Sequence, residues 1–298
     1  MSGASALISA EGQAPWVEVL ASLAQHRVLT AAQVRAMHLP ENRLRWAQRL
    51  LAALEDEGLA ARAPGRRAQR VWFITEHGLE VVRSAGALEG EAPLLDERSA
   101  SGRLMAHTLA VNDVGIAFMR AARERGEDFG AMSWRHEVAH PLSAGRGRRR
   151  SLLIADAVLT YLREDGADTV VEQRFLELDR GTRSVEGLAA ELATYARLRR
   201  ARDAKGEPIW RERYPAFPSV LCALAGAGAE FLGRRRERVA ALLRADPAVA
   251  SSPRPAIRFC LLADLLGAGP FAPIFREPRD PERPIDWLGT EAEAGRRG

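Results

Sequence analysis

Three carboxylates lie in two apolar segments of the second half of the chain. Asp156 belongs to a predicted strand over residues 152–162, and Glu177 and Asp179 end a predicted strand over residues 169–179. Because side chains alternate between the two faces of a strand, Glu177 and Asp179 point the same way. If the two strands pair, Asp156 lies beside them, and such a cluster can hold Mg²⁺, which polarises a phosphate and activates water. The trio is therefore a candidate catalytic site, with Asp156 and Glu177 as its metal ligands.

The elements around this trio predict a mixed domain. A helix is predicted over residues 102–125, and a strand over residues 131–138 precedes the two strands that carry the trio. An apolar stripe over residues 185–198 indicates another helix, and strands over residues 218–224 and 257–262 flank a helix over residues 230–244. The order of helix, three strands, helix and strand resembles the αβββαβ core of the PD-(D/E)XK nuclease superfamily. The predicted fold class is thus α+β or α/β, with a nuclease-like second domain.

The sequence departs from an active nuclease of this kind at the third strand. The resemblance implies a Glu-X-Lys pattern there, in which the lysine stabilises charge at the scissile phosphate, but Asp179 occupies the lysine position. Glu191 stands where a lysine of the following helix would be expected, and Lys205 lies beyond that helix. In the alternative interpretation the trio is a structural relic, with Asp179 accepting hydrogen bonds in a turn and Glu177 paired with an arginine. The sequence leaves enzymatic activity open and favours an inactive domain, and Mg²⁺ is expected as a cofactor only if the trio is active.

The first third of the chain predicts three helices followed by a basic hairpin. Helices are predicted over residues 16–24, 30–37 and 41–57, strands over 59–62 and 71–74, and a further helix from residue 75. Thr30 and Gln33 have the spacing of a capping box at the start of the second helix. In the third helix Leu44, Ala47, Leu50, Leu51 and Leu54 form the apolar stripe. This order is typical of a winged helix-turn-helix, whose third helix enters the major groove of DNA while the hairpin contacts the backbone. A winged helix that binds protein is the alternative.

Basic and amide side chains lie on both elements that would touch DNA. Asn42, Arg45 and Arg49 share the face of the third helix opposite its leucines. A Gly/Arg loop over residues 143–150 is also suited to a phosphate backbone, although a merely solvated loop is the alternative. The predicted DNA-binding residues are Asn42, Arg43, Arg45, Arg49, Arg66, Arg67, Arg70, Arg146, Arg148, Arg149 and Arg150.

The composition excludes several classes of protein. Hydrophobic residues make up 47% of the 298 residues and charged residues 28%, as in globular proteins that bury a core. No stretch approaches the ~20 apolar residues that span a bilayer, and two cysteines are too few for a disulfide framework. All but one of the 43 basic residues are arginine, the better bidentate phosphate ligand. We expect a cytoplasmic protein that binds double-stranded DNA, without a membrane or small-molecule substrate, and a homodimer is left open.

Composition shifts predict the domain boundaries. Residues 1–14 are a polar lead-in, residues 15–83 the winged helix, and residues 84–102 a Gly-, Ala- and Glu-rich linker. The nuclease-like domain is predicted over residues 103–276, and a Pro/Gly-rich tail over residues 277–298.

Several segments resemble one narrower family. They are His-Thr-Leu-Ala-Val-Asn-Asp at 107–113, Ile-Ala-Asp-Ala at 154–157, Phe-Leu-Glu-Leu-Asp-Arg-Gly-Thr at 175–182, Tyr-Pro-Ala-Phe-Pro at 214–218 and Gly-Ala-Gly-Pro at 267–270. In this order they are similar to the plasmid replication-relaxation proteins. The resemblance implies a DNA-binding protein of plasmid or mobile-element origin that acts in replication or relaxation, or in transcription regulation of those genes. The alternatives are a Mg²⁺-dependent DNA nickase or nuclease that uses the acidic trio, and a protein–protein scaffold.

Overall fold

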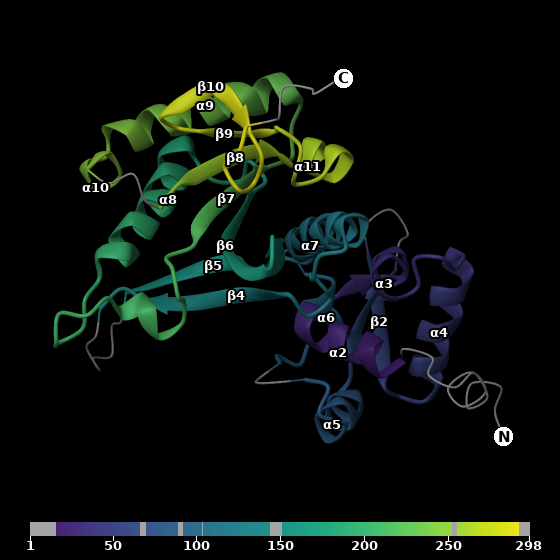
Figure 1. Cartoon of the computed structure of the whole chain (residues 1–298). Coiled ribbons are helices and arrows are strands. Elements are labelled where there is room, and N and C mark those ends of the chain that lie inside the picture. The colour runs from purple at the N-terminus through teal and green to yellow at the C-terminus, as the bar shows by residue number, and fades with distance from the viewer. Residues whose placement is uncertain are drawn as a thin grey trace. The chain divides into compact units, whose positions relative to one another are not determined.

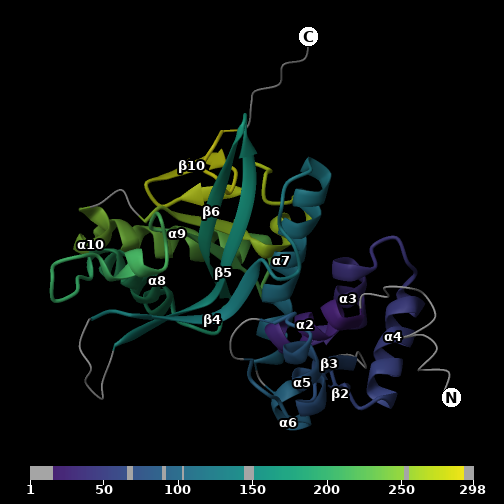
Figure 2. The same cartoon turned by 60° about the horizontal axis from the view of Figure 1, so that its bottom comes forward.

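The chain has a mixed α and β fold that divides into two compact units. The computed structural model describes residues 16–65, 70–88, 92–102, 104–143, 151–251 and 255–291. Of these, residues up to 119 together with 130–132 form the first unit, and residues 120–129 with those from 133 onward form the second. The predicted class of N-terminal helices followed by a multi-stranded sheet is confirmed (Figures 1 and 2). In the described part of the chain, no helix is long and apolar enough to cross a membrane.

The first unit begins with three helices and a three-stranded antiparallel sheet. Its elements are α2 (Trp16–His26), β1 (Leu29–Thr30), α3 (Ala31–His38), α4 (Leu44–Asp56), β2 (Ala60–Pro64), β3 (Arg70–Ile74) and α5 (Glu76–Ser84). The strand order is β1-β3-β2, so β3 is central. The predicted sequence of three helices and a hairpin is therefore present, together with the two-residue strand β1, which is too short to show an alternating pattern.

Local signals explain where these helices start and stop. The Thr30 hydroxyl accepts a hydrogen bond from the backbone N–H of Gln33, and the Gln33 side chain accepts one from the Thr30 N–H, which confirms the capping box that begins α3. The remaining amide hydrogens of Gln33 are donated to the Leu109 carbonyl and to Asp113 Oδ1. Gly58 follows α4 with φ of +69°, a left-handed conformation that favours glycine. Gln33 therefore caps α3 and also connects it by hydrogen bonds to the later helix that contains Leu109 and Asp113.

The back of this sheet is covered by two later helices, α6 (Glu97–Ala100) and α7 (Met105–Arg125). Val71 and Phe73 of β3 pack with Ala100 and Met105, and Ala100 is only 1% exposed. Residues 92–102, predicted as linker, therefore contribute packing to the first unit. The two units divide within α7, after residue 119, so most of the helix predicted to open the second domain belongs to the first unit.

The second unit is built on a seven-stranded sheet with the order β10-β9-β8-β7-β6-β5-β4. The strands are β4 (Trp134–Pro141), β5 (Leu152–Asp165), β6 (Asp168–Asp179), β7 (Ser219–Leu224), β8 (Ile257–Leu261), β9 (Phe275–Glu277) and β10 (Asp280–Ile285). β6, β7 and β8 are parallel, and the other neighbours are antiparallel. The order of α7, β4, β5, β6, the next helix and β7 is the predicted helix, three strands, helix and strand.

Two long helices, α8 (Val185–Arg200) and α9 (Ala229–Ala245), lie side by side in this unit (Figures 1 and 2). Leu192 and Tyr195 of α8 share a core with Phe175 of β6 and Val220 of β7. The shorter helices are the 3-10 helix η2 (Ile209–Glu212), α10 (Pro247–Ala250) and α11 (Leu262–Ala268). α8 and α9 therefore cover one face of the sheet, and the candidate carboxylates have to fit beneath these helices.

The C-terminal segment differs from the predicted tail. Residues 275–285 form the hairpin β9–β10, and Trp287 is fully buried. Pro281 and Pro284 are tolerated because β10 is the edge strand, where a missing N–H breaks no ladder hydrogen bond. The proline content that suggested a tail reflects an edge position in the sheet.

Burial of His26 predicts acid sensitivity of the first unit. The ring Nε2 lies 2.7 Å from the Ala131 carbonyl oxygen, and burial lowers the His26 pKa to about 3. The unfolded chain therefore binds one more proton between about pH 6.5 and pH 3, and stability is lost as the pH falls through this window. We expect a loss of about 2 kcal/mol at pH 5 relative to pH 7. His26→Gln should remove this component of the pH dependence, as measured by thermal unfolding at several pH values.

The matched control is His77→Gln, because His77 is exposed on α5 and only 3.9 Å from an exposed Glu80. It should keep the acid sensitivity of the wild type. An unchanged pH profile in His26→Gln would contradict the assignment.

Candidate nucleic-acid interface and carboxylate cluster

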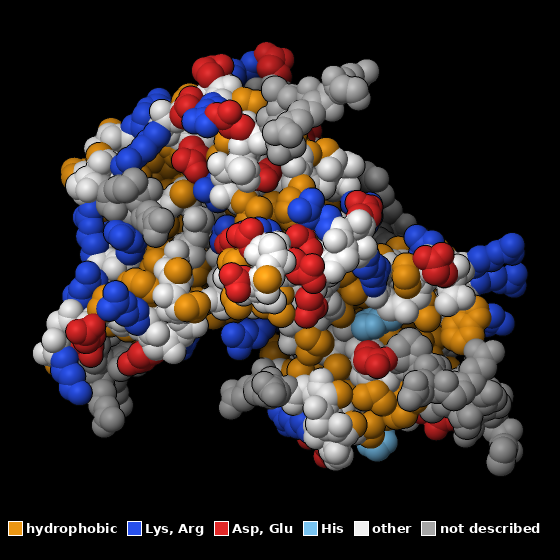
Figure 3. Space-filling model, viewed as in Figure 1, with side chains coloured by type: hydrophobic (Ala, Val, Ile, Leu, Met, Phe, Trp, Pro, Cys, Tyr) orange, Lys and Arg blue, Asp and Glu red, His pale blue; other side chains and the backbone are white. Residues whose placement is uncertain are grey.

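The exposed side of α4 carries the predicted residues Arg45 and Arg49. The helix begins at Leu44 and not at residue 41 as predicted, so Asn42 and Arg43 precede it and do not share its face. Ala47, Leu50, Leu51 and Leu54 are buried as the stripe predicts, whereas Asn42, Arg43, Arg45 and Arg49 are exposed. The Arg49 guanidinium lies 5.7 Å from the centroid of the Trp46 ring. Figure 3 shows basic side chains at the edge of the first unit, over α4. The helix therefore presents a positively charged surface on the side opposite its core.

The two predicted basic loops are described only in part. Arg70 is the first residue of β3 and is exposed. Six further predicted residues lie outside the described residues: Arg66, Arg67, Arg146, Arg148, Arg149 and Arg150.

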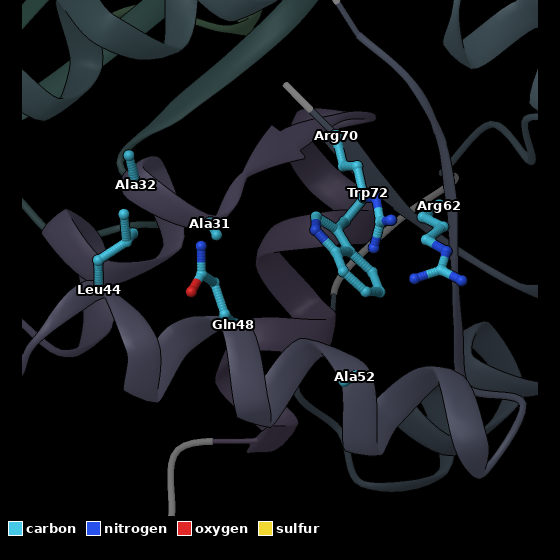
Figure 4. Close-up of a pocket in the computed structure, with 8 residues that line it drawn as sticks. All are labelled: Ala31, Ala32, Leu44, Gln48, Ala52, Arg62, Arg70 and Trp72. Atoms are coloured by element: carbon cyan, nitrogen blue, oxygen red, sulfur yellow. The ribbon is translucent and has the colours of Figure 1, made fainter. Parts of the chain in front are cut away.

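A groove separates α4 from the β2–β3 hairpin, and we call it the α4–hairpin groove. Its volume is about 580 Å³. Figure 4 shows its lining: Ala31 and Ala32 of α3, Leu44, Gln48 and Ala52 of α4, and Arg62, Arg70 and Trp72 of the hairpin. Leu44 was expected in the apolar stripe of α4, but it is 42% exposed because it borders this groove.

Arg62 and Gln48 were missed in the sequence, although a signal for Arg62 exists. Arg62 pairs directly with Trp72 across the hairpin, and Pro64 pairs with Arg70, so the two arginines lie on the same face of the hairpin. Side chains alternate between the two faces of a strand, and applying this rule to both strands of the hairpin would have placed Arg62 and Arg70 on one face. Arg62 also forms an ion pair with Glu55 of α4 at 3.1 Å, between side chains that are 45% and 29% exposed.

Asp179 is bound by a buried arginine. Arg235 of α9 donates from Nε to Asp179 Oδ2 at 2.6 Å and from Nη2 to Asp179 Oδ1 at 3.2 Å, and their side chains are only 7% and 1% exposed. Arg235 also donates to the Arg183 carbonyl, and the Gly181 N–H donates to Asp179 Oδ1. This geometry agrees with the alternative in which Asp179 accepts hydrogen bonds in a turn. Both oxygens of its carboxylate therefore accept hydrogen bonds from these partners.

Glu177 is buried beside Asp156. Its Oε1 accepts a hydrogen bond from the Tyr195 hydroxyl at 2.5 Å, and its Oε2 has no partner in the described part of the chain. Burial raises the pKa of Glu177 well above its usual value, and the nearby charges of Asp156 and Glu191 raise it further. No arginine forms an ion pair with Glu177 among the described residues, unlike the expectation for a structural relic. Glu177 is instead bound by the Tyr195 hydroxyl.

Asp156 lies where the pairing of β5 with β6 ends. The last paired residues are Ala157 and Leu176, and beyond them Asp156 Oδ2 accepts a hydrogen bond from the Leu178 N–H at 2.8 Å. The side chain therefore replaces a strand–strand hydrogen bond. Its neighbour across the site is Glu191 of α8, which forms an ion pair with Arg183, and the pKa of Glu191 is raised by burial and by Asp156.

The structure thus brings Asp156 and Glu177 together but joins them with Glu191 rather than with Asp179. Within the described ranges, no group of three or more His, Cys, Asp or Glu side chains is placed to hold a metal ion. Sequence reasoning noted Glu191 only as a missing lysine, and it did not connect Arg235 with Asp179, because 56 residues separate the two in the chain.

Removing Arg235 should destabilise the second unit strongly. Arg235→Met leaves the Asp179 carboxylate buried without its counter-charge, and we expect a loss of about 3–5 kcal/mol in the free energy of unfolding. Asp179→Asn combined with Arg235→Met should recover much of the loss, because no uncompensated charge remains. Arg234→Ala is the control: Arg234 is 61% exposed and pairs with an exposed Glu230, so its removal should cost less than about 1 kcal/mol. Equal effects of Arg235→Met and Arg234→Ala in denaturant unfolding would refute the role of the pair.

Comparison with known proteins places the chain in a family. The model of the replication-relaxation family matches residues 20–209, which is more than half of the chain and includes α4, the hairpin and both Asp156 and Glu177. A search of curated proteins and a search of solved structures found no match. The segments that resemble this family in the sequence fall largely within the matched range, and the chain belongs to the replication-relaxation family.

Proposed function

We propose that the first unit binds double-stranded DNA as a winged helix, with α4 in the major groove and the β2–β3 hairpin against the backbone. The observation that carries this proposal is the exposed side of α4, where Arg45 and Arg49 project opposite the buried leucines, with Asn42 and Arg43 exposed just before the helix starts. Arginine and asparagine are suited to both phosphates and base edges in the major groove. The strand order β1-β3-β2 supports the same arrangement, because it places β2 and β3 side by side as a hairpin.

We further propose that this DNA belongs to a plasmid or mobile element. The family supports a role in replication or relaxation of such DNA, or in transcription regulation of its genes. The proposed location is the cytoplasm, where this DNA is found.

For the second unit, we propose a nuclease-like domain that holds DNA without cutting it. The order of α7, β4, β5, β6, α8 and β7 supports the nuclease-like fold. The buried pair of Asp179 and Arg235 supports inactivity, because a bound carboxylate is not free to ligate a metal ion. The alternative of a metal-dependent nickase depends on Asp156 and Glu177, which remain close to each other.

A cleavage assay separates these two possibilities. We expect supercoiled plasmid to stay intact during incubation with the protein and Mg²⁺ or Mn²⁺. Nicking that requires the metal and disappears in Asp156→Ala would overturn the inactive assignment. Nicking that persists in Asp156→Ala would point to a contaminating nuclease and leave the assignment standing.

Substitution of two arginines on α4 tests DNA binding. Arg45→Ala with Arg49→Ala should weaken binding to duplex DNA, and the slope of log affinity against log salt should fall by about 1.8, since each phosphate contact contributes about 0.9. Gel-shift or anisotropy titrations at several salt concentrations provide the measurement.

A charge-matched control is available in the same unit. Arg83 at the end of α5 and Arg98 on α6 are exposed, and neither lies on α4 or on the hairpin. Their double alanine variant should keep most of the affinity. Unchanged affinity in the α4 variant would refute the proposed interface.

A further inference from the structure

We propose that the α4–hairpin groove binds the sugar–phosphate backbone of one DNA strand. This inference rests on the proposed DNA binding, and it assigns a part of the duplex to a groove that includes Arg62 and Gln48, which the sequence did not single out. The groove is bounded by Leu44, Gln48 and Ala52 on α4 and by Arg62, Arg70 and Trp72 on the hairpin (Figure 4).

The charged groups of the groove select an anion. Arg62 and Arg70 are diagonal neighbours on one face of the hairpin, and no carboxylate is among the lining residues. Arg70 is exposed and lines the groove together with Arg62. Guanidinium groups bind phosphate oxygens in a bidentate manner and stay charged at all physiological pH values.

The uncharged lining matches the rest of a nucleic acid strand. Trp72 lies directly across the hairpin from Arg62 and two residues from Arg70 on β3, and Leu44 and Ala52 line the same groove from α4. An apolar floor between two cations suits a chain in which anionic phosphates alternate with apolar sugar faces. Gln48 adds an amide that can donate to a phosphate oxygen.

The first turn of α3 contributes further donors to the same groove. Ala31 and Ala32 are its first two residues, and both line the groove. Backbone N–H groups at a helix start attract anions, and alanine side chains leave room for the ligand to approach them. The two arginines, the Gln48 amide and the start of α3 therefore all favour an anionic ligand.

Glu55 competes with this ligand. Its carboxylate pairs with Arg62 at 3.1 Å in the free protein, and a phosphate would replace it as the partner of Arg62. Removing the negative charge of Glu55 should therefore increase affinity for DNA. This direction is informative, because a misfolded variant loses affinity and does not gain it.

The test compares four single variants in anisotropy titrations against several unrelated duplexes over a range of salt concentrations. Arg62→Ala and Arg70→Ala should each weaken binding roughly tenfold on every duplex, as expected for loss of a charged hydrogen bond. Each should also lower the salt slope by about 0.9. Glu55→Gln should bind several-fold more tightly, and Arg83→Ala, outside the groove, should match the wild type.

Each contrary result has a distinct meaning. If Arg62→Ala, Arg70→Ala and Glu55→Gln all bind like the wild type while the Arg45 and Arg49 double variant loses affinity, the groove assignment is overturned and the proposed function stands. If the wild type binds no DNA, both fall. A loss confined to one duplex sequence would mean that the groove reads bases, which also overturns the assignment.

A calorimetric titration with a deoxynucleoside monophosphate distinguishes a backbone from a free nucleotide. We expect weak binding at most, because a single phosphate engages only part of the groove. Tight binding that requires Arg62, with DNA affinity unchanged in Arg62→Ala, would identify a free nucleotide as the occupant and overturn the assignment.

Discussion

The buried ion pair between Asp179 and Arg235 is the interaction on which the second unit depends. Transferring two charges out of water is costly, and the cost is offset only when both groups find complete sets of partners. Asp179 accepts hydrogen bonds from Nε and Nη2 of Arg235 and from the Gly181 N–H, while Arg235 also donates to the Arg183 carbonyl. These bonds join the end of β6, the segment that leads into α8, and α9. The same hydrogen bonds therefore hold α9 over the sheet and determine the partners of Asp179.

The two carboxylates beside this ion pair have hydrogen-bond partners of their own. Two carboxylates, Asp156 and Glu177, remain neighbours near the end of the β5–β6 pairing, but each already has a structural partner: Leu178 N–H for Asp156 and the Tyr195 hydroxyl for Glu177. Burial raises the pKa of Glu177, which favours its neutral form and reduces repulsion between the two groups. Hydrogen bonds therefore hold both carboxylates of the cluster in place, and the raised pKa of Glu177 reduces the repulsion between them.

The first unit differs in that one side of α4 remains exposed. Its sheet is buried on one face by the helices of the N-terminal half and on the other by α6 and α7, with Ala100 and Met105 against Val71 and Phe73. With the sheet fixed in this way, α4 keeps one face in the core and exposes the other. The hairpin arginines Arg62 and Arg70 then lie opposite α4 across the groove, each next to Trp72 on the same face of the hairpin.

The sequence by itself determined most of the local structure: the apolar stripe of α4, the Thr30–Gln33 capping box, and the order of helices and strands around Asp156 and Glu177. These features depend on periodicity and on contacts a few residues apart, which a single sequence displays. The partners of the functional side chains depend instead on residues that are distant in the chain. Arg235 for Asp179, Glu191 beside Asp156, and Ala100 behind β3 were decided only by the tertiary structure. The physical reason is that burying a charge or an apolar face requires a partner without specifying where in the chain that partner lies.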